Sequence, residues 1–421
     1  MEINNRLFKV NFKQLSYLSY AILIFWALLN IFTPEQYRIL TRLFNFIIIP
    51  SGFVFIFALF QGYINKGKIS YNSGILLKMI GGLLAFFIAT IGGVTQLIIV
   101  IRTLIVLFFL LFYLHYRNEL SQNQKLNLSS FFYWSFFVFI IFNLFLYGEL
   151  NPDFFFPSTM DKNYTGILFY FLLMLSIHRK NIVGIFISCI YILLMTQSRS
   201  LYGMIAIYFL VKIFKTPIYN IIQTLHLKKT FKQFLLLLIG ILCLSSFWIQ
   251  CIAINPLSQY REGLNDGSNK MRFAANIYAE QQLINNPQYF YKGLGDHIKE
   301  TFGVADKDFS THTRFMGVRL VQPHNCFLNM MLKIGIFEAL IYFWLLGTVL
   351  DKIWSRDNIE YYIPYLVNAC FMHSLLDGPY LVIWSFVLMA TQENANENTN
   401  GVKSCDYKIK MPFSISWGRF F

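Results

Sequence analysis

Residues 131–148 read FFYWSFFVFIIFNLFLYG, a stretch dominated by apolar and aromatic side chains and without a single charge. A helix of about 18 or more such residues is long enough to cross a hydrocarbon core of roughly 30 Å. Backbone N–H and C=O groups inside a bilayer have to be hydrogen-bonded within the protein, and a helix achieves this along one segment. The stretch therefore predicts a transmembrane helix.

The rest of the chain has the same character. The 421 residues are 56% hydrophobic and only 13% charged, and the mean hydropathy is +0.51. A soluble domain is about a quarter charged, and it could not bury so much apolar surface. The composition therefore predicts an all-α integral membrane protein.

Apolar runs divide the chain into about twelve predicted transmembrane helices. They lie at 15–33, 43–63, 74–92, 95–115, 131–148, 164–177, 181–196, 200–214, 232–250, 324–350, 360–376 and 379–391. The first nine fall within residues 1–250 and the last three within 324–391. Between them lies one large loop, 251–323, and a polar tail follows at 392–421.

Basic residues test this layout, because Lys and Arg collect in the cytoplasmic loops of membrane proteins. With the N-terminus in the cytoplasm, twenty Lys and Arg fall on the cytoplasmic side and four in the short loops on the other side. This bias predicts cytoplasmic termini and a large extracytoplasmic loop. It also explains the net charge of +14 as a topology signal, so the charge does not indicate a nucleic-acid partner.

The extracytoplasmic loop at 251–323 is the only predicted extramembrane segment large enough to fold over a site. Residues 268–286, SNKMRFAANIYAEQQLINN, predict a helix along the membrane surface that carries Arg272. Asn286-Pro287 and the glycines of GLG at 293–295 end it. Spacing alone is equally compatible with a solvated helix whose arginine has no special role.

His324 ends the loop, directly before an apolar helix. Histidine exchanges protons near neutral pH, so at this boundary it is a candidate catalytic residue. An isolated histidine here is also typical of a helix cap. Asn325 follows it, and Arg314 and Arg319 lie just upstream; these three are further candidates for substrate contact.

Two more arginines are candidates for binding an anion. Arg199 lies in the outer turn TQSRS at 196–200, and its guanidinium offers a planar fork of donors that suits a phosphate. The alternative is an arginine that reaches from a helix end to the bilayer surface. Arg102 lies inside a predicted helix, where an exposed charge is costly, so it should face the protein interior.

No metal or nucleotide signature is present in the sequence. The chain has no Walker loop, no GxGxxG after a strand and no HExxH. We therefore expect neither a metal nor another cofactor. An enzyme on the outer face has no access to cytosolic nucleotides, so its donor substrate has to be preactivated and carried by a lipid.

Three stretches follow one another after the middle spans of the chain: TQSRS at 196–200, NPQYFYKGLG at 286–295 and HNCFLNMMLKIG at 324–335. This order resembles the bacterial O-antigen polymerases and O-antigen ligases (Wzy and WaaL). The resemblance covers roughly residues 160–390. It departs from the ligase pattern at Glu338, where ligases have Gly, Thr or Tyr, and this difference favours a polymerase.

The resemblance implies a GT-C-like membrane fold and a metal-independent, inverting glycosyltransferase of polysaccharide and lipopolysaccharide biosynthesis. Its donor would be a glycan on undecaprenyl pyrophosphate at the periplasmic face of the inner membrane. Arg199 and Arg272 would hold the pyrophosphate, and His324 would activate or orient the acceptor hydroxyl. Membrane lipid and a chain-length regulator protein would be its other partners.

Three functions remain open on the sequence. A polymerase joins the chain to another lipid-linked repeat unit, and a ligase joins it to the lipid A core. A flippase or other transporter of lipid-linked glycans would perform no chemistry, and Arg102 gives that alternative its only support. The long loop that ends in His324 and Asn325 counts against the transporter.

Overall fold

The structure, a computed structural model, describes residues 12–32, 122–147, 162–196, 198–224, 267–303, 311–353, 356, 358–372, 375–376 and 378–391. This part of the chain is mostly helical, which confirms the predicted helical class. The predicted helices at 43–63, 74–92, 95–115 and 232–250 lie outside the described residues, as do Arg102 and the tail at 392–421.

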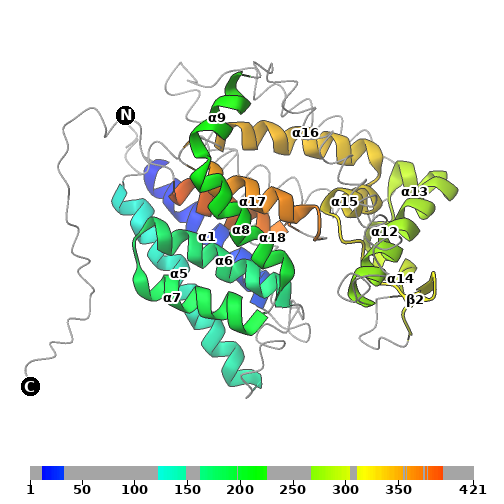
Figure 1. Cartoon of the computed structure of the whole chain (residues 1–421), viewed down its shortest axis with the longest axis horizontal. Helices are drawn as coiled ribbons and strands as arrows, with labels where there is room; N and C mark the ends of the chain where they lie inside the picture. The colour runs from blue at the N-terminus through cyan, green and yellow to red at the C-terminus, as the bar shows by residue number, and fades with distance from the viewer. Residues whose placement is uncertain are drawn as a thin grey trace, which may run out of the picture.

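One group of helices forms a bundle (Figure 1). Its members are α1 (Phe12–Phe32), α5 (Gln122–Tyr147), α6 (Lys162–His178), α7 (Ile182–Ile190), η2 (Tyr191–Thr196), α8 (Arg199–Ile213), α9 (Lys215–Thr224), α17 (Ile359–Ala369) and α18 (Gly378–Ala390). The bounds of α1, α6, α8 and α18 lie close to the predicted runs, because polar turns flank these apolar stretches. α5 begins nine residues before the predicted run at 131–148, α17 ends seven residues before the end of the run at 360–376, and α9 was not predicted. The predicted run at 181–196 forms the α-helix α7 in its first part and the π-helix η2 in its last part.

A second group, the loop lobe, lies at one end of the bundle (Figure 1). It consists of α12 (Gly267–Asn285), α13 (Pro287–Lys292), η4 (Gly295–His297), α14 (Ile298–Thr301), β1 (Arg314–Phe315), β2 (Val318–Arg319) and α15 (Cys326–Ile334). From this lobe α16 (Ile336–Ile353) runs back along the bundle. The predicted helix at 268–286 is present as α12.

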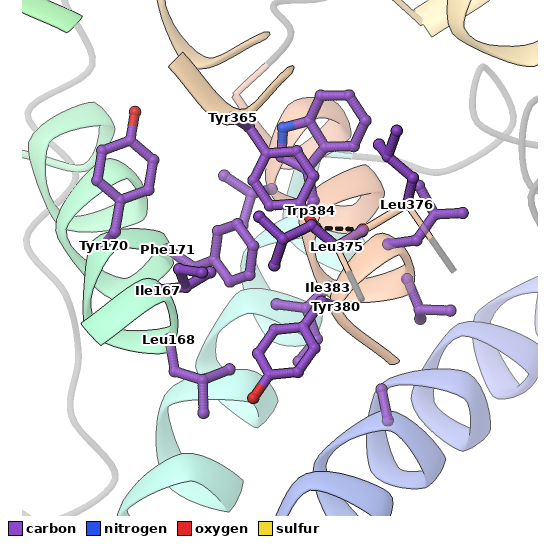
Figure 2. Packing of buried hydrophobic residues seen from close by; sticks show 14 of the residues in the cluster. Ile167, Leu168, Tyr170, Phe171, Tyr365, Leu375, Leu376, Tyr380, Ile383 and Trp384 are labelled. Carbon is purple, nitrogen blue, oxygen red and sulfur yellow. Dashed lines mark hydrogen bonds between the residues drawn. The ribbon is translucent and has the colours of Figure 1, made fainter. Parts of the chain in front are cut away.

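Aromatic side chains fill the core between α6, α17 and α18 (Figure 2). Tyr365 stacks on Trp384 with ring centroids 4.3 Å apart, and its hydroxyl donates to the carbonyl of Leu375 at 2.6 Å. Phe171 of α6 lies 5.6 Å from Tyr365, centroid to centroid. The buried hydroxyl therefore has its partner, and the three helices are fixed relative to one another.

The helices α8 and α17 run antiparallel. The end of α8 lies beside the start of α17, because the Tyr208 and Tyr361 rings are 5.7 Å apart and Lys215 Nζ is 2.9 Å from Glu360 Oε1. The two helices then pack extensively against each other. Arg199, at the start of α8, therefore lies at the end of the bundle where α17 stops.

One predicted helix is interrupted in the structure. The run at 324–350 is two helices, α15 and α16, separated at Gly335 with φ +84°. A Cβ on Gly335 would lie 2.2 Å from the carbonyl oxygen of Tyr291, and a Cβ on Gly293 would lie 2.6 Å from the amide nitrogen of Gly335. The break exists because main chain from α13 packs directly onto main chain here, an approach that only glycine permits.

Among the described residues, no single helix is both long enough and apolar enough to span a bilayer. One pair of helices, Arg199–Ile213 and Lys215–Ile222, meets both requirements together, with a bend of 83° between them.

Candidate functional site

His324 is held from two directions in the turn before α15. Its backbone N–H donates to Oδ1 of Asn276 on α12 at 3.0 Å. Its ring Nδ1 lies 2.8 Å from the carbonyl oxygen of Gln322. A carbonyl oxygen only accepts, so Nδ1 carries the proton and Nε2 of the neutral ring is the acceptor. The buried imidazole is thus fixed in orientation and in tautomer.

Arg272 belongs to the same helical face as Asn276. The two residues are four apart on α12, so their side chains lie one turn from each other. Arg272 is half-buried. Arg272 therefore lies one helical turn from Asn276, which bonds the backbone of His324 although it lies 48 positions away in the sequence.

Asn325 is a helix cap. Its Oδ1 accepts from the backbone amides of Phe327 at 2.9 Å and Leu328 at 3.1 Å. These amides would otherwise lack partners at the start of α15. Asn325 therefore has a structural role, and its carboxamide oxygen is occupied by the two amides. As the N-cap, it places His324 just outside the first turn of α15.

Arg199 lies at the same end of the bundle as His324. Ser198, beside it, donates its hydroxyl hydrogen to Oδ1 of Asn163 at the start of α6. The next residue, Tyr164, packs on Tyr380 of α18 with centroids 5.2 Å apart. The starts of α6, α8 and α18 therefore gather at one end of the bundle.

Cys326 connects this end of the bundle to the loop lobe. Its Sγ accepts from the backbone amide of Leu375 at 3.1 Å, in the segment between α17 and α18. The start of α15 thereby joins the starts of α6, α8 and α18. Helix N-termini carry partial positive charge, so this end of the bundle favours an anion.

Arg314 and Arg319 are directly opposed across the β1–β2 hairpin. Arg314 is exposed and Arg319 is half-buried. Like charges in opposed positions on two strands repel each other. The hairpin packs on α12, the helix that carries Arg272.

Sequence reasoning missed two residues of the site. Asn276 anchors His324, and Glu280 lies one further turn along α12 with a half-buried carboxyl group. Burial raises the pKa of Glu280 to about 7. The spacing of Arg272, Asn276 and Glu280 at i, i+4 and i+8 is visible in the sequence, and it could have identified both residues once the helix was predicted.

Metal ligands are not grouped in the described part of the chain, where no three His, Cys, Asp or Glu side chains lie together. The contact that the structure shows is between His324 and Asn276, with Arg272 and Glu280 one helical turn to either side of Asn276 on α12. Arg199 begins α8, at the end of the bundle to which Cys326 connects the loop lobe. The chain matches no protein-family model, no curated protein and no solved structure. The function therefore has to be argued from this site.

Proposed function

We propose that the chain is an O-antigen polymerase of the bacterial inner membrane. It transfers a glycan from undecaprenyl pyrophosphate to a second lipid-linked repeat unit on the periplasmic face. One observation carries the proposal: Asn276 bonds the backbone of His324 from the helix that bears Arg272. The turn that carries a candidate acid–base group is thereby attached to the helix that carries a candidate phosphate ligand.

The roles follow from the chemistry of the side chains. Arg272 and Arg199 bind the pyrophosphate, because a guanidinium fork forms charge-assisted hydrogen bonds to phosphate oxygens. These bonds strengthen as the leaving group gains charge, so they lower the barrier. His324 activates or orients the acceptor hydroxyl. No metal is required, and a chain-length regulator is the expected protein partner.

The arrangement of charge supports this location. Arg199 and His324 belong to one end of the bundle, and Lys215 and Arg356 belong to the other, where Arg356 Nη2 donates to Thr216 Oγ1 at 3.0 Å. A site at one end and basic residues at the opposite end agree with a site outside the cytoplasm and a positive cytoplasmic face.

Deletion of the gene tests the activity. The lipopolysaccharide of the deletion strain should run on a gel as lipid A core that carries a single repeat unit. Core without any repeat, together with accumulated lipid-linked polymer, would instead identify a ligase. Lipid-linked repeat units retained in the cytoplasmic leaflet would identify a flippase. A wild-type ladder would contradict all three functions.

Point variants test the site within that strain. His324→Ala and Arg272→Ala should fail to restore the ladder, because each removes a group from the reacting centre; loss of one acid–base group alone lowers a rate by about 10²–10⁴. Glu300→Gln is the matched control, since Glu300 is exposed and paired only with exposed His297 in the described part. If both site variants restore a normal ladder in membranes with normal protein content, the site is wrong.

A further inference from the structure

Three side chains of α12 follow one another at intervals of one turn. Arg272, Asn276 and Glu280 are each four residues apart, so they lie along one side of the helix and span about 12 Å from first to last. Asn276, in the middle, is the residue that holds His324. The helix thus presents a cation, the anchor of a histidine and a carboxyl group in that order.

We propose that Glu280 is the catalytic residue on the acceptor side of the site, where it takes the proton of the attacking sugar hydroxyl. This inference rests on the proposed glycosyl transfer and refines it. Glu280 accepts the proton, and His324 orients the acceptor. In an inverting displacement the base and the leaving group stand on opposite faces of the donor sugar. Arg272 and Glu280, at opposite ends of the row, match that geometry.

The surroundings of Glu280 support a functional role. Its carboxyl group is half-buried, and it has no hydrogen bond or ion pair with any residue that the structure describes. Because it is only partly buried, the carboxyl group remains open to solvent, and an acceptor hydroxyl can therefore reach it. The exposed carboxylate of Glu300, in contrast, is paired with His297 at 2.7 Å.

Burial is the sole cause of the raised pKa of Glu280, which is about 7. A general base works best when its pKa lies near the working pH. Other ionisable side chains on the elements packed against α12 are Tyr289, Tyr291 and Lys292 of α13, Lys333 of α15, and Arg314 and Arg319 of the hairpin. None of them lowers the pKa of Glu280 toward its ordinary value.

The proposed step is a single displacement at the anomeric carbon. The acceptor oxygen forms a bond to the anomeric carbon of the donor while its proton passes to the Glu280 carboxylate. The bond from the anomeric carbon to the phosphate oxygen breaks, and the undecaprenyl pyrophosphate leaves with the electron pair. Arg272 binds the added negative charge. Glu280 then returns its proton to water, and the new glycosidic bond has inverted configuration.

An acceptor without a proton separates this role from donor activation. Purified full-length protein is supplied with lipid-linked repeat units extracted from the source bacterium, in the absence and presence of sodium azide. Azide attacks the anomeric carbon as an anion and therefore needs no base. Glu280→Gln should lower transfer to the sugar hydroxyl by about 10²–10⁴-fold and leave formation of the glycosyl azide unchanged.

Two further variants make the test specific. Arg272→Ala should lose both products, because it acts on the leaving group that they share. Glu300→Gln should retain both. The inference on Glu280 is overturned if Glu280→Gln still transfers to the hydroxyl at the wild-type rate, or if it loses both products equally. If wild-type protein forms neither product, the proposed function itself fails, which is a distinguishable result.

Discussion

His324 illustrates how little of a site depends on the reacting side chain alone. Its main chain is bonded to Asn276, its ring to the carbonyl of Gln322, and the following residue caps α15. The first contact sets the position of His324, the second sets the tautomer of its ring, and the cap sets the direction in which the chain enters α15. The imidazole is therefore pre-oriented before any substrate binds, which removes part of the entropic barrier to reaction.

The protonation of Glu280 links the site to stability. Its pKa is about 7 in the folded protein and 4.5 without the protein environment, so the folded state binds its proton more tightly than the unfolded state. The free energy of unfolding therefore falls as the pH rises from about 4.5 to 7. Glu280→Gln removes this penalty, and we expect a higher melting temperature than wild type at pH 8 and a nearly equal one at pH 4, where the carboxyl group is mostly protonated in both states.

The measurement is a thermal melt of purified protein in detergent at the two pH values. Glu300→Gln serves as the control, because an exposed carboxylate carries no burial penalty, and its melting temperature should follow wild type at both. A Glu280→Gln protein that is less stable than wild type at pH 8 would show that the carboxylate has a stabilising partner.

Sequence could suggest the individual residues of the site but not their pairing. Arg199, Arg272 and His324 were identified from residue type and position in the chain. The bond between Asn276 and His324 joins positions 48 residues apart, and no local pattern encodes it. The raised pKa of Glu280 likewise depends on how α12 packs, and packing is not visible in composition.

At the scale of elements, hydropathy located the bundle helices and failed at the α15–α16 break. The predicted runs at 200–214 and 379–391 agree closely with α8 and α18. Residues 324–350 are continuously apolar enough to suggest one helix, and glycine is tolerated inside transmembrane helices. The break depends on Gly293 packing against Gly335 from a distant part of the chain, which hydropathy does not detect.

Gly335→Ala tests the importance of that break. The substitution places a side chain at φ +84° and brings its Cβ within 2.2 Å of the Tyr291 carbonyl oxygen. We expect a loss of about 2 kcal/mol or more of stability from the unfavourable dihedral and the clash together. A lower melting temperature, and weaker transfer as α13 is displaced from α15, would be the observed effects.

Gly317→Ala is a control for a positive φ without a steric contact. Gly317 has φ +77°, yet an added Cβ meets no atom within 4 Å. It should lose only the dihedral contribution of about 1–2 kcal/mol. Equal losses in the two variants would mean that the contact between Gly335 and Tyr291 contributes nothing.

At the scale of the whole molecule, the two ends of the bundle differ in chemistry. One end joins the loop lobe through the Leu375–Cys326 hydrogen bond. The other end holds the bend between α8 and α9, with Lys215 paired to Glu360 at 2.9 Å. From the count of basic residues along the sequence, we expect the second end to face the cytoplasm.

Cysteine labelling tests which end faces outward. Met316, at the tip of the hairpin, and Ile221, on α9, are both 60% exposed. In intact spheroplasts a membrane-impermeant maleimide should label Met316→Cys, because we expect the lobe to lie outside the cytoplasm. Ile221→Cys should react only after the membrane is opened. The reverse pattern would contradict the proposed orientation, and wild-type protein measures labelling of the native cysteines.

The contact between Gly293 and Gly335 has an evolutionary consequence. It joins main chain to main chain, and the amide of Leu294 adds a hydrogen bond to the carbonyl of Leu332 at 2.6 Å. The surrounding side chains can therefore change during evolution. Both glycines should be retained, because a methyl group at either position collides with backbone. Distant homologues should be recognisable by a pair of invariant glycines, the second eleven residues after the histidine, even where the rest of the sequence has diverged beyond alignment.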